Sequence, residues 1–169
     1  MIKKIIFFLI FLSFSSNAYS QSKIAYVDLK YLINESEPGK KINQLLVDLR
    51  NKENQELKKI QEKLKKKENE FKSKNKILND EEKRKTIDKL RSDFNDLNNL
   101  KNKKEKEFNQ KKTEYINKLL AEVNKILVSY VNKNSIDIVI KKENLITGKK
   151  DLDITKIILD ELNKKKIKF

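Results

Sequence analysis

The stretch that decides the fold is residues 40–133, which read KKINQLLVDLRNKENQELKKIQEKLKKKENEFKSKNKILNDEEKRKTIDKLRSDFNDLNNLKNKKEKEFNQKKTEYINKLLAEVNKILVSYVNK. These 94 residues contain neither glycine nor proline, so they are expected to be helical. A single helix of this length without internal caps is unusual in a globular domain. Asn79 or Asp80 can cap a new helix, and Glu81 and Glu82 then lie where a helix N-terminus favours negative charge. The sequence therefore predicts a helical hairpin arm over residues 40–133 with its tip near residues 79–82.

A pairing test supports this hairpin. If the chain reverses at about residue 80, facing residues have numbers that sum to about 161, so Ile42 faces Leu119 and Leu64 faces Leu97. The apolar residues of both arms recur mostly at intervals of three, four or seven, which is typical of an interrupted coiled-coil seam. At about 1.5 Å per residue, arms of about 39 residues each reach roughly 58 Å.

Apolar residues are spread unevenly along the predicted hairpin. Residues 65–114 contain nine apolar residues in 50, whereas residues 115–131 contain eleven in 17. We therefore expect the base of the hairpin to pack tightly and the distal arms to be flexible, because local opening is easiest where apolar contacts are few. A weak but rigid two-helix coil is the alternative. The residues expected to pack at the base are Ile116, Leu119, Leu120, Val123 and Leu127.

The N-terminus has the layout of a cleaved signal peptide over residues 1–20. Two lysines precede the apolar run IIFFLIFLSF at residues 5–14, and small residues follow, with cleavage expected between Ser20 and Gln21. The apolar run is shorter than the roughly 20 residues that a spanning helix needs. An uncleaved anchor is the alternative. We expect the mature chain to be exported from the cytoplasm.

The composition excludes several classes of site. The 169 residues include no cysteine, no histidine and only two glycines. Thiolate and imidazole metal sites, Ser–His or Cys–His nucleophile pairs and glycine-rich phosphate loops are therefore excluded. Isolated carboxylate pairs or a Ser–Lys pair would lie on an open helical surface with no convergent pocket. We predict no enzymatic activity, no cofactor and no metal.

The net charge of +15 is concentrated on the predicted hairpin. Residues 40–133 carry 27 basic and 16 acidic side chains, a balance of +11. Two basic clusters lie toward the tip, and such a field attracts acidic proteins or anionic lipid surfaces. A solvated helix face with lysine enriched by codon bias is the alternative. The clusters are Lys65, Lys66, Lys67 and Lys83, Arg84, Lys85.

Nucleic acid is the obvious competing partner for a basic chain. Only three of the 40 basic residues are arginine, and lysine lacks the bidentate fork that reads base edges. Specific nucleic-acid binding is therefore not expected.

The remaining residues, 21–39 and 134–169, are expected to form a small α/β body. Apolar β-branched runs predict strands at residues 24–27 and 135–140, a further short strand is expected at residues 145–148, and a final helix at residues 156–162. Residues 34–39 form the clearest predicted loop. A body of 55 residues is near the lower limit for a stable core, so self-association is expected. The residues expected at the oligomer contact are Ile24, Val27, Ile136, Ile138 and Ile140.

Several segments together resemble the Skp/OmpH family of periplasmic chaperones over essentially the whole mature chain. They are KIAYVD at residues 23–28, PGK at 38–40, IDIVI at 136–140, LITG at 145–148 and LDIT at 152–155. The resemblance implies a homotrimer in which short strands form a shared β body with three hairpin tentacles. It also implies ATP-independent binding of unfolded outer-membrane proteins, with lipopolysaccharide or another anionic lipid as a further surface contact.

These expectations combine into one main hypothesis. The chain is predicted to be a mainly α-helical periplasmic holdase that keeps unfolded outer-membrane proteins soluble before membrane insertion. The alternative is a structural coiled-coil or envelope-tethering protein that recognises one folded partner.

Overall fold

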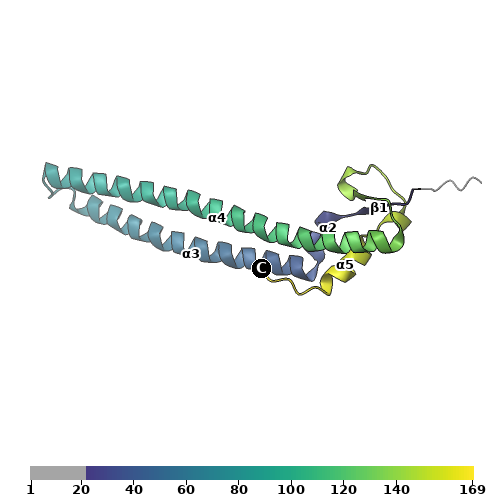
Figure 1. Cartoon of the computed structure of the whole chain (residues 1–169). Coiled ribbons are helices and arrows are strands. Elements are labelled where there is room, and N and C mark those ends of the chain that lie inside the picture. Colours follow the sequence, from purple (N-terminus) through teal and green to yellow (C-terminus); the bar gives the residue numbers. More distant parts are fainter. Residues whose placement is uncertain (1–21) are drawn as a thin grey trace, which may run out of the picture.

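The computed structural model describes residues 22–169. The predicted signal peptide and its cleavage site between Ser20 and Gln21 lie outside the described residues. Within the described part, no helix is both long enough and apolar enough to span a membrane. The chain forms a long two-helix hairpin that projects from a small body (Figure 1). The predicted mainly helical fold is confirmed.

The hairpin consists of α3 (Glu37–Lys74) and α4 (Asp80–Asn134), which lie antiparallel (Figure 1). Asn79 caps α4 in a capping box: its side chain accepts a hydrogen bond from the Glu82 N–H at 2.9 Å, and the Glu82 carboxylate accepts one from the Asn79 N–H at 3.1 Å. Residues 80–82 are therefore the first turn of α4, and the chain reverses over residues 75–79, slightly before the predicted tip.

The register of the hairpin follows the predicted pairing. Lys67 pairs with Asp93 at 2.6 Å, and Lys104 pairs with Glu56 at 3.1 Å. In both pairs the residue numbers sum to 160, which agrees with the predicted sum of about 161. The alignment of the two helices is therefore readable from the apolar pattern alone.

The body is built on two short parallel strands, β1 (Ile24–Val27) and β2 (Ile138–Lys141), with Ile24 opposite Ile138. Parallel neighbours need a crossover connection, and here the whole hairpin supplies it. The second strand begins later than predicted. Ser135 ends α4 in the left-handed conformation with φ of 50°, and β2 starts only after the turn that follows.

The predicted loop at residues 34–39 is wrong, because helix occupies nearly all of it. The helix α2 (Leu29–Glu35) is separated from α3 by Ser36 alone. The Ser36 side chain caps α3 by accepting a hydrogen bond from the Gly39 N–H at 3.1 Å, and Pro38 lies in the first turn, where its missing N–H costs nothing. Residues that usually mark a loop here begin a helix.

The predicted strand at residues 145–148 is also wrong. This segment joins two single-turn 3₁₀ helices, η1 (Lys142–Asn144) and η2 (Lys150–Leu152). The free side of β1 is already taken, since Tyr26 forms a bridge with Asp153 and accepts the Ile154 N–H at 3.0 Å. The final helix, α5 (Thr155–Asn163), follows directly.

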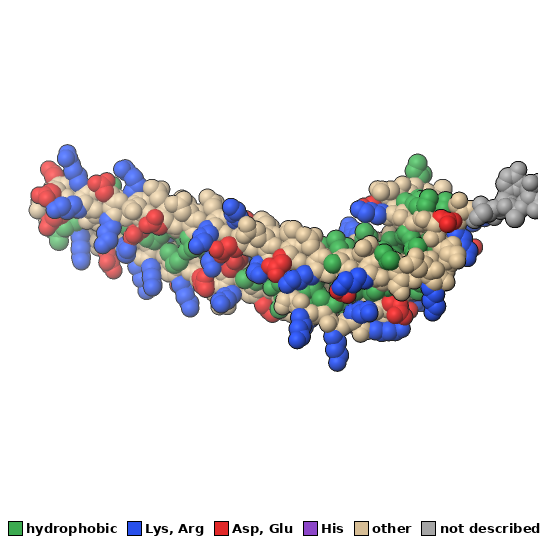
Figure 2. All heavy atoms as spheres, viewed as in Figure 1, with side chains coloured by type: hydrophobic (Ala, Val, Ile, Leu, Met, Phe, Trp, Pro, Cys, Tyr) green, Lys and Arg blue, Asp and Glu red, His purple; other side chains and the backbone are tan. Residues whose placement is uncertain are grey.

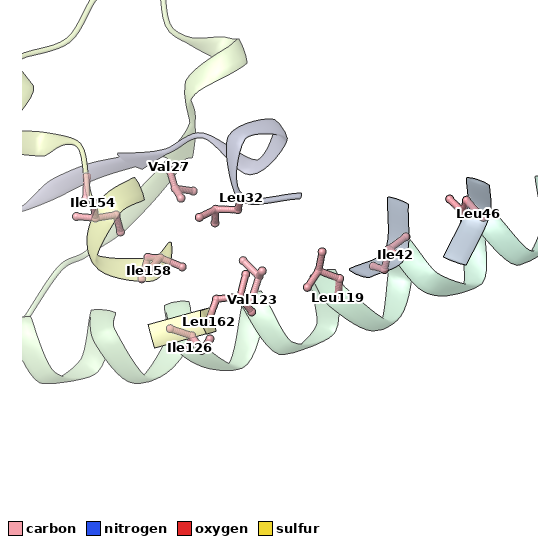
Figure 3. Packing of buried hydrophobic residues seen from close by; sticks show 11 residues of the cluster. Val27, Leu32, Ile42, Leu46, Leu119, Val123, Ile126, Ile154, Ile158 and Leu162 are labelled. Atoms are coloured by element: carbon pink, nitrogen blue, oxygen red, sulfur yellow. The ribbon is translucent and has the colours of Figure 1, made fainter. Parts of the chain in front are cut away.

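One apolar core joins the body to the base of the hairpin (Figure 3). Side chains from β1, α2, α3, α4 and α5 converge there, so the hairpin is anchored at one end only. The fully or nearly fully buried members include Val27, Leu32, Ile42, Leu119, Val123, Ile126, Ile154, Ile158 and Leu162.

Candidate functional site

The distal hairpin has a sparse seam. Leu64 and Leu97 are 4% and 5% exposed and form one apolar contact layer between the arms. Beyond this layer Phe71 and Leu90 are only half-buried, and Phe94 remains exposed. The outer arms therefore present apolar side chains to solvent in a scattered pattern, without a closed pocket.

A polar layer crosses the hairpin nearer its base. Arg50 donates to Glu105 through its two terminal guanidinium nitrogens, with the shorter contact at 2.7 Å, and its guanidinium carbon lies 3.6 Å from the centre of the Phe108 ring. The hydrogen bond from Arg50 lowers the pKa of the Glu105 carboxyl. In the same way, the hydrogen bond to Glu56 raises the pKa of Lys104. Charge pairing holds the arms together where apolar residues are few.

Glu53 lies inside this polar layer. Its side chain is only 4% exposed, and its Oε2 atom has no hydrogen-bond partner in the described structure. The pKa of Arg50 is raised chiefly by its hydrogen bond to Glu105, and the Glu53 charge adds to this effect. The pKa of Lys104 is raised chiefly by its hydrogen bond to Glu56, and the Glu53 charge again adds to it. A buried carboxylate with an unsatisfied oxygen is costly, so this layer is a weak point in the seam.

The predicted basic clusters are only partly neutralised. Lys67 pairs with Asp93 across the hairpin, and Lys83 and Lys85 pair with acidic residues one turn away in α4. Among residues 22–169, no ion pair includes the other three cluster residues, Lys65, Lys66 and Arg84. Figure 2 shows basic side chains along the whole hairpin with acidic ones between them. The arm surface therefore carries a diffuse positive field.

The five residues predicted at the oligomer contact do not all face outward. Val27 is 2% exposed and belongs to the core of its own chain, whereas Ile24 and Ile138 are 42% and 51% exposed. These two isoleucines are opposite each other in the parallel register, so they lie on one face of the sheet. Ile136 and Ile140 are half-buried. The exposed pair lies on a sheet in which, among residues 22–169, β2 pairs with β1 alone and leaves its other edge free.

The predicted base residues lie where α4 enters the body. Leu119 and Val123 are completely or almost completely buried, and Ile116, Leu120 and Leu127 are half-buried. Within the chain this face is covered by α2 and α5, whose apolar side chains join the same core. Sequence reasoning missed the partners from α2 and α5, although the four-residue spacing of Ile154, Ile158 and Leu162 is a readable helical signal.

The described residues include no group of three or more histidine, cysteine, aspartate or glutamate residues placed to hold a metal ion. The arrangement is instead an elongated, charged surface with scattered apolar side chains. Such a surface suits many weak contacts with an extended chain.

Comparison with known proteins is consistent with this geometry. A family model described as "Outer membrane protein (OmpH-like)" matches residues 23–162. Six chains of solved structures match significantly. One of them, from Caulobacter crescentus, is a protein assigned as an OmpH-like outer membrane chaperone, with a TM-score of 0.78 over 85% of each chain and 14% identity. At this identity the likeness shows the fold alone. None of the curated proteins compared with the chain matches it.

Proposed function

The chain belongs to the OmpH-like family, and from this premise we propose that it is an ATP-independent periplasmic chaperone. It binds unfolded outer-membrane proteins and prevents their aggregation before membrane insertion. The protein acts as a holdase: it delays aggregation by contact, and its client folds elsewhere.

The sparse, basic distal hairpin is the observation that carries this proposal. An unfolded client has no fixed shape, so it needs diffuse attraction more than complementarity. The scattered apolar side chains of the arms, such as Phe94 at 41% exposure, offer weak and exchangeable contacts. The positive field along the arms increases the encounter rate with acidic segments.

A homotrimer would give these arms a shared client space. The exposed Ile24 and Ile138 and the free edge of β2 support association through the body, because unpaired edges and exposed apolar pairs favour contact with another copy. Three hairpins anchored to one body would then surround a client. The same positive arms would contact anionic lipid or lipopolysaccharide at the membrane surface.

The decisive experiment dilutes a urea-unfolded outer-membrane barrel into buffer with and without the mature protein, at low and at high salt. Light scattering should fall strongly at low salt, and the protection should weaken at high salt, since surface charges are screened. Absence of protection at low salt would overturn the proposal. Protection or binding confined to one folded partner would favour a tethering role.

An arm-shortened variant tests which part of the molecule acts. Ile60 and Leu100 border the same hollow between the helices, so a short glycine-containing loop can join them in place of residues 61–99. This variant should keep the body and lose client protection. A full-length control, with Lys65, Lys66 and Arg84 changed to glutamine, should keep protection at reduced affinity. An arm-shortened protein that still protects clients would contradict the assignment of the arms.

A further inference from the structure

Residues 164–169, here called the strap, run from the end of α5 back along the base of the hairpin (Figure 1). After Lys164 the strap has no regular secondary structure. Its side chains alternate in exposure: Lys166 and Lys168 are exposed, whereas Ile167 and Phe169 are half-buried. The strap therefore lies on the hairpin as an extended segment with one apolar side.

The strap rests on one stripe of α4. The rings of Phe169 and Tyr115 meet edge to face, with centroids 5.9 Å apart and an angle of 65°. Ile167 and Phe169 both pack against the main core from outside. Strap residues 165–168 border a hollow together with Lys118, Ala121 and Glu122. We call the α4 surface formed by Tyr115, Lys118, Ala121 and Glu122 the strap site.

The strap is held mainly by its side chains. Among the hydrogen bonds of residues 22–169, the last one made by the strap backbone joins the Lys165 N–H to the Leu162 carbonyl at 3.0 Å. The backbone of residues 166–169 makes none in that set. A segment with few apolar contacts and no backbone bonding opens at low free-energy cost. The strap site can therefore be exposed while the hairpin and the body stay folded.

The strap has the pattern of the segments that an outer-membrane barrel contains. Each strand of such a barrel alternates apolar and polar residues, with aromatic residues near the membrane interfaces. An unfolded strand can place its apolar side chains where Ile167 and Phe169 lie and stack an aromatic ring on Tyr115. Lys111, whose Nζ lies 5.8 Å from the centre of the Tyr115 ring, forms an ion pair with Glu114 at 2.8 Å beside that position.

We propose that the strap site is a binding site for extended client segments with alternating apolar side chains, and that the strap is a built-in competitor for it. This inference rests on the proposed function and names one of its contact sites at the hairpin base. A client segment must displace the strap to bind. The measured association constant is therefore the intrinsic one multiplied by the fraction of molecules whose strap site is open.

A single substitution gives a direct readout of this displacement. The chain has no tryptophan, so Phe169→Trp introduces one fluorophore at the strap site. The probe is a ten-residue peptide in which isoleucine and tyrosine alternate with serine and threonine. The control peptide has the same composition, with the apolar residues in one block. The alternating peptide should shift the tryptophan emission to the red and the blocked peptide should not. An unchanged emission at saturating alternating peptide would overturn the proposal.

Affinity measurements provide the second test. Fluorescence anisotropy of the labelled alternating peptide should show binding about 3- to 10-fold tighter to a chain ending at Asn163, because the competitor is gone. The variant Ile167→Ser with Phe169→Ser should reproduce this gain at full length. The matched control, Lys166→Ser with Lys168→Ser, changes the outward side of the same segment and should show no gain. Equal or weaker binding in the Ile167→Ser, Phe169→Ser variant would contradict the competitor role.

The two proposals fail in different ways. If the unmodified protein suppresses barrel aggregation, but strap removal leaves the peptide affinity unchanged and the alternating peptide leaves the emission of the Phe169→Trp variant unchanged, the strap is a structural clamp and the chaperone proposal stands. If the unmodified protein does not suppress aggregation, the chaperone proposal fails, whatever the peptides show.

Discussion

Gly39 shows how a single residue fixes the joint between the body and the arm. A Cβ atom at this position would lie 1.9 Å from the Ile33 carbonyl oxygen and 2.9 Å from the Ser36 Oγ. The close approach of α2 to the first turn of α3 therefore needs glycine. We expect Gly39→Ala to lower the free energy of unfolding by about 2 kcal/mol, because the helices must separate. Urea titration followed by circular dichroism measures the free energy of unfolding, and the control is Lys40→Ala at the exposed neighbouring residue. Equal effects of the two changes would contradict the steric argument.

Asp28 makes stability depend on pH. Its carboxylate accepts the Tyr31 N–H at 2.8 Å and pairs with Lys142 at 3.2 Å, and these contacts, the backbone hydrogen bond first, lower its pKa below the ordinary value near 3.8. A lowered pKa stabilises the folded state above pH 3.8, and this contribution is lost as pH falls through the folded pKa.

Asp28 is the N-cap residue of α2. The substitution Asp28→Ala should therefore lower the free energy of unfolding by about 1 kcal/mol near neutral pH, the usual contribution of an N-cap. The difference from the unmodified protein should shrink as pH falls below about 4. Thermal unfolding at several pH values measures it. Asp28→Asn, which can still cap α2, should lose less at neutral pH. A difference that stays constant down to acid pH would rule out the charged carboxylate as the cause.

Glu53 is a residue whose removal should stabilise the hairpin. Its unpartnered Oε2 is buried in the seam, and leucine has similar volume without a charge to desolvate. Replacing buried charged groups with apolar ones is often neutral or stabilising by about 1 kcal/mol or more. Glu53→Leu should raise the melting temperature by a few degrees, and Glu53→Gln should not. A clear fall in melting temperature for Glu53→Leu would show that Arg50 and Lys104 depend on the Glu53 charge.

At the scale of the elements, α4 should be stable at one end and open readily at the other. Its body-proximal part contains Leu119, Val123 and Ile126, all buried, while Leu97 is the one buried apolar residue in residues 65–114. Native-state hydrogen exchange should therefore show protection of residues 115–131 that exceeds that of residues 80–96 by about 100-fold or more. Uniform protection along α4 would mean that the arm opens as one rigid unit.

The same contrast explains how far the sequence predicts the elements. The hairpin, its register and the Asn79 cap follow from periodicity and capping, which are local properties. The α2–α3 junction does not, because Pro38 and Gly39 suit a loop as well as a helix start until Ile33 is placed beside them. The expected strand at residues 145–148 fails because Asp153 occupies the free side of β1, which is a tertiary fact.

The candidate binding surfaces also combine features that the sequence predicts with features that depend on tertiary contacts. The charge of the arms is visible in composition, but which lysines are neutralised depends on neighbours across the hairpin, as Lys67 and Asp93 show. The strap could not be recognised from sequence, since an alternating segment of six residues becomes meaningful only when Phe169 is seen against Tyr115.

At the scale of the whole molecule, the body is too small to be expected to stand alone, and its exposed face indicates where another copy would dock. Ile24 and Ile138 are adjacent and about half exposed on the face of a sheet with a free edge. A lysine at position 138 would place a charge in the proposed contact, where it would have to be desolvated. We therefore expect Ile138→Lys to shift the protein from the proposed trimer toward monomer in sedimentation or light-scattering measurements of molar mass.

The matched control is Ile157→Lys, which introduces the same charge at an isoleucine of 43% exposure on α5 and should leave the molar mass unchanged. Because a monomer has one hairpin and no enclosed client space, Ile138→Lys should also lose most of its protection of an unfolded barrel while its circular dichroism spectrum stays helical. A variant that dissociates and still protects would mean that single arms suffice and that the shared cavity is unnecessary. A variant that remains trimeric would move the contact away from this face.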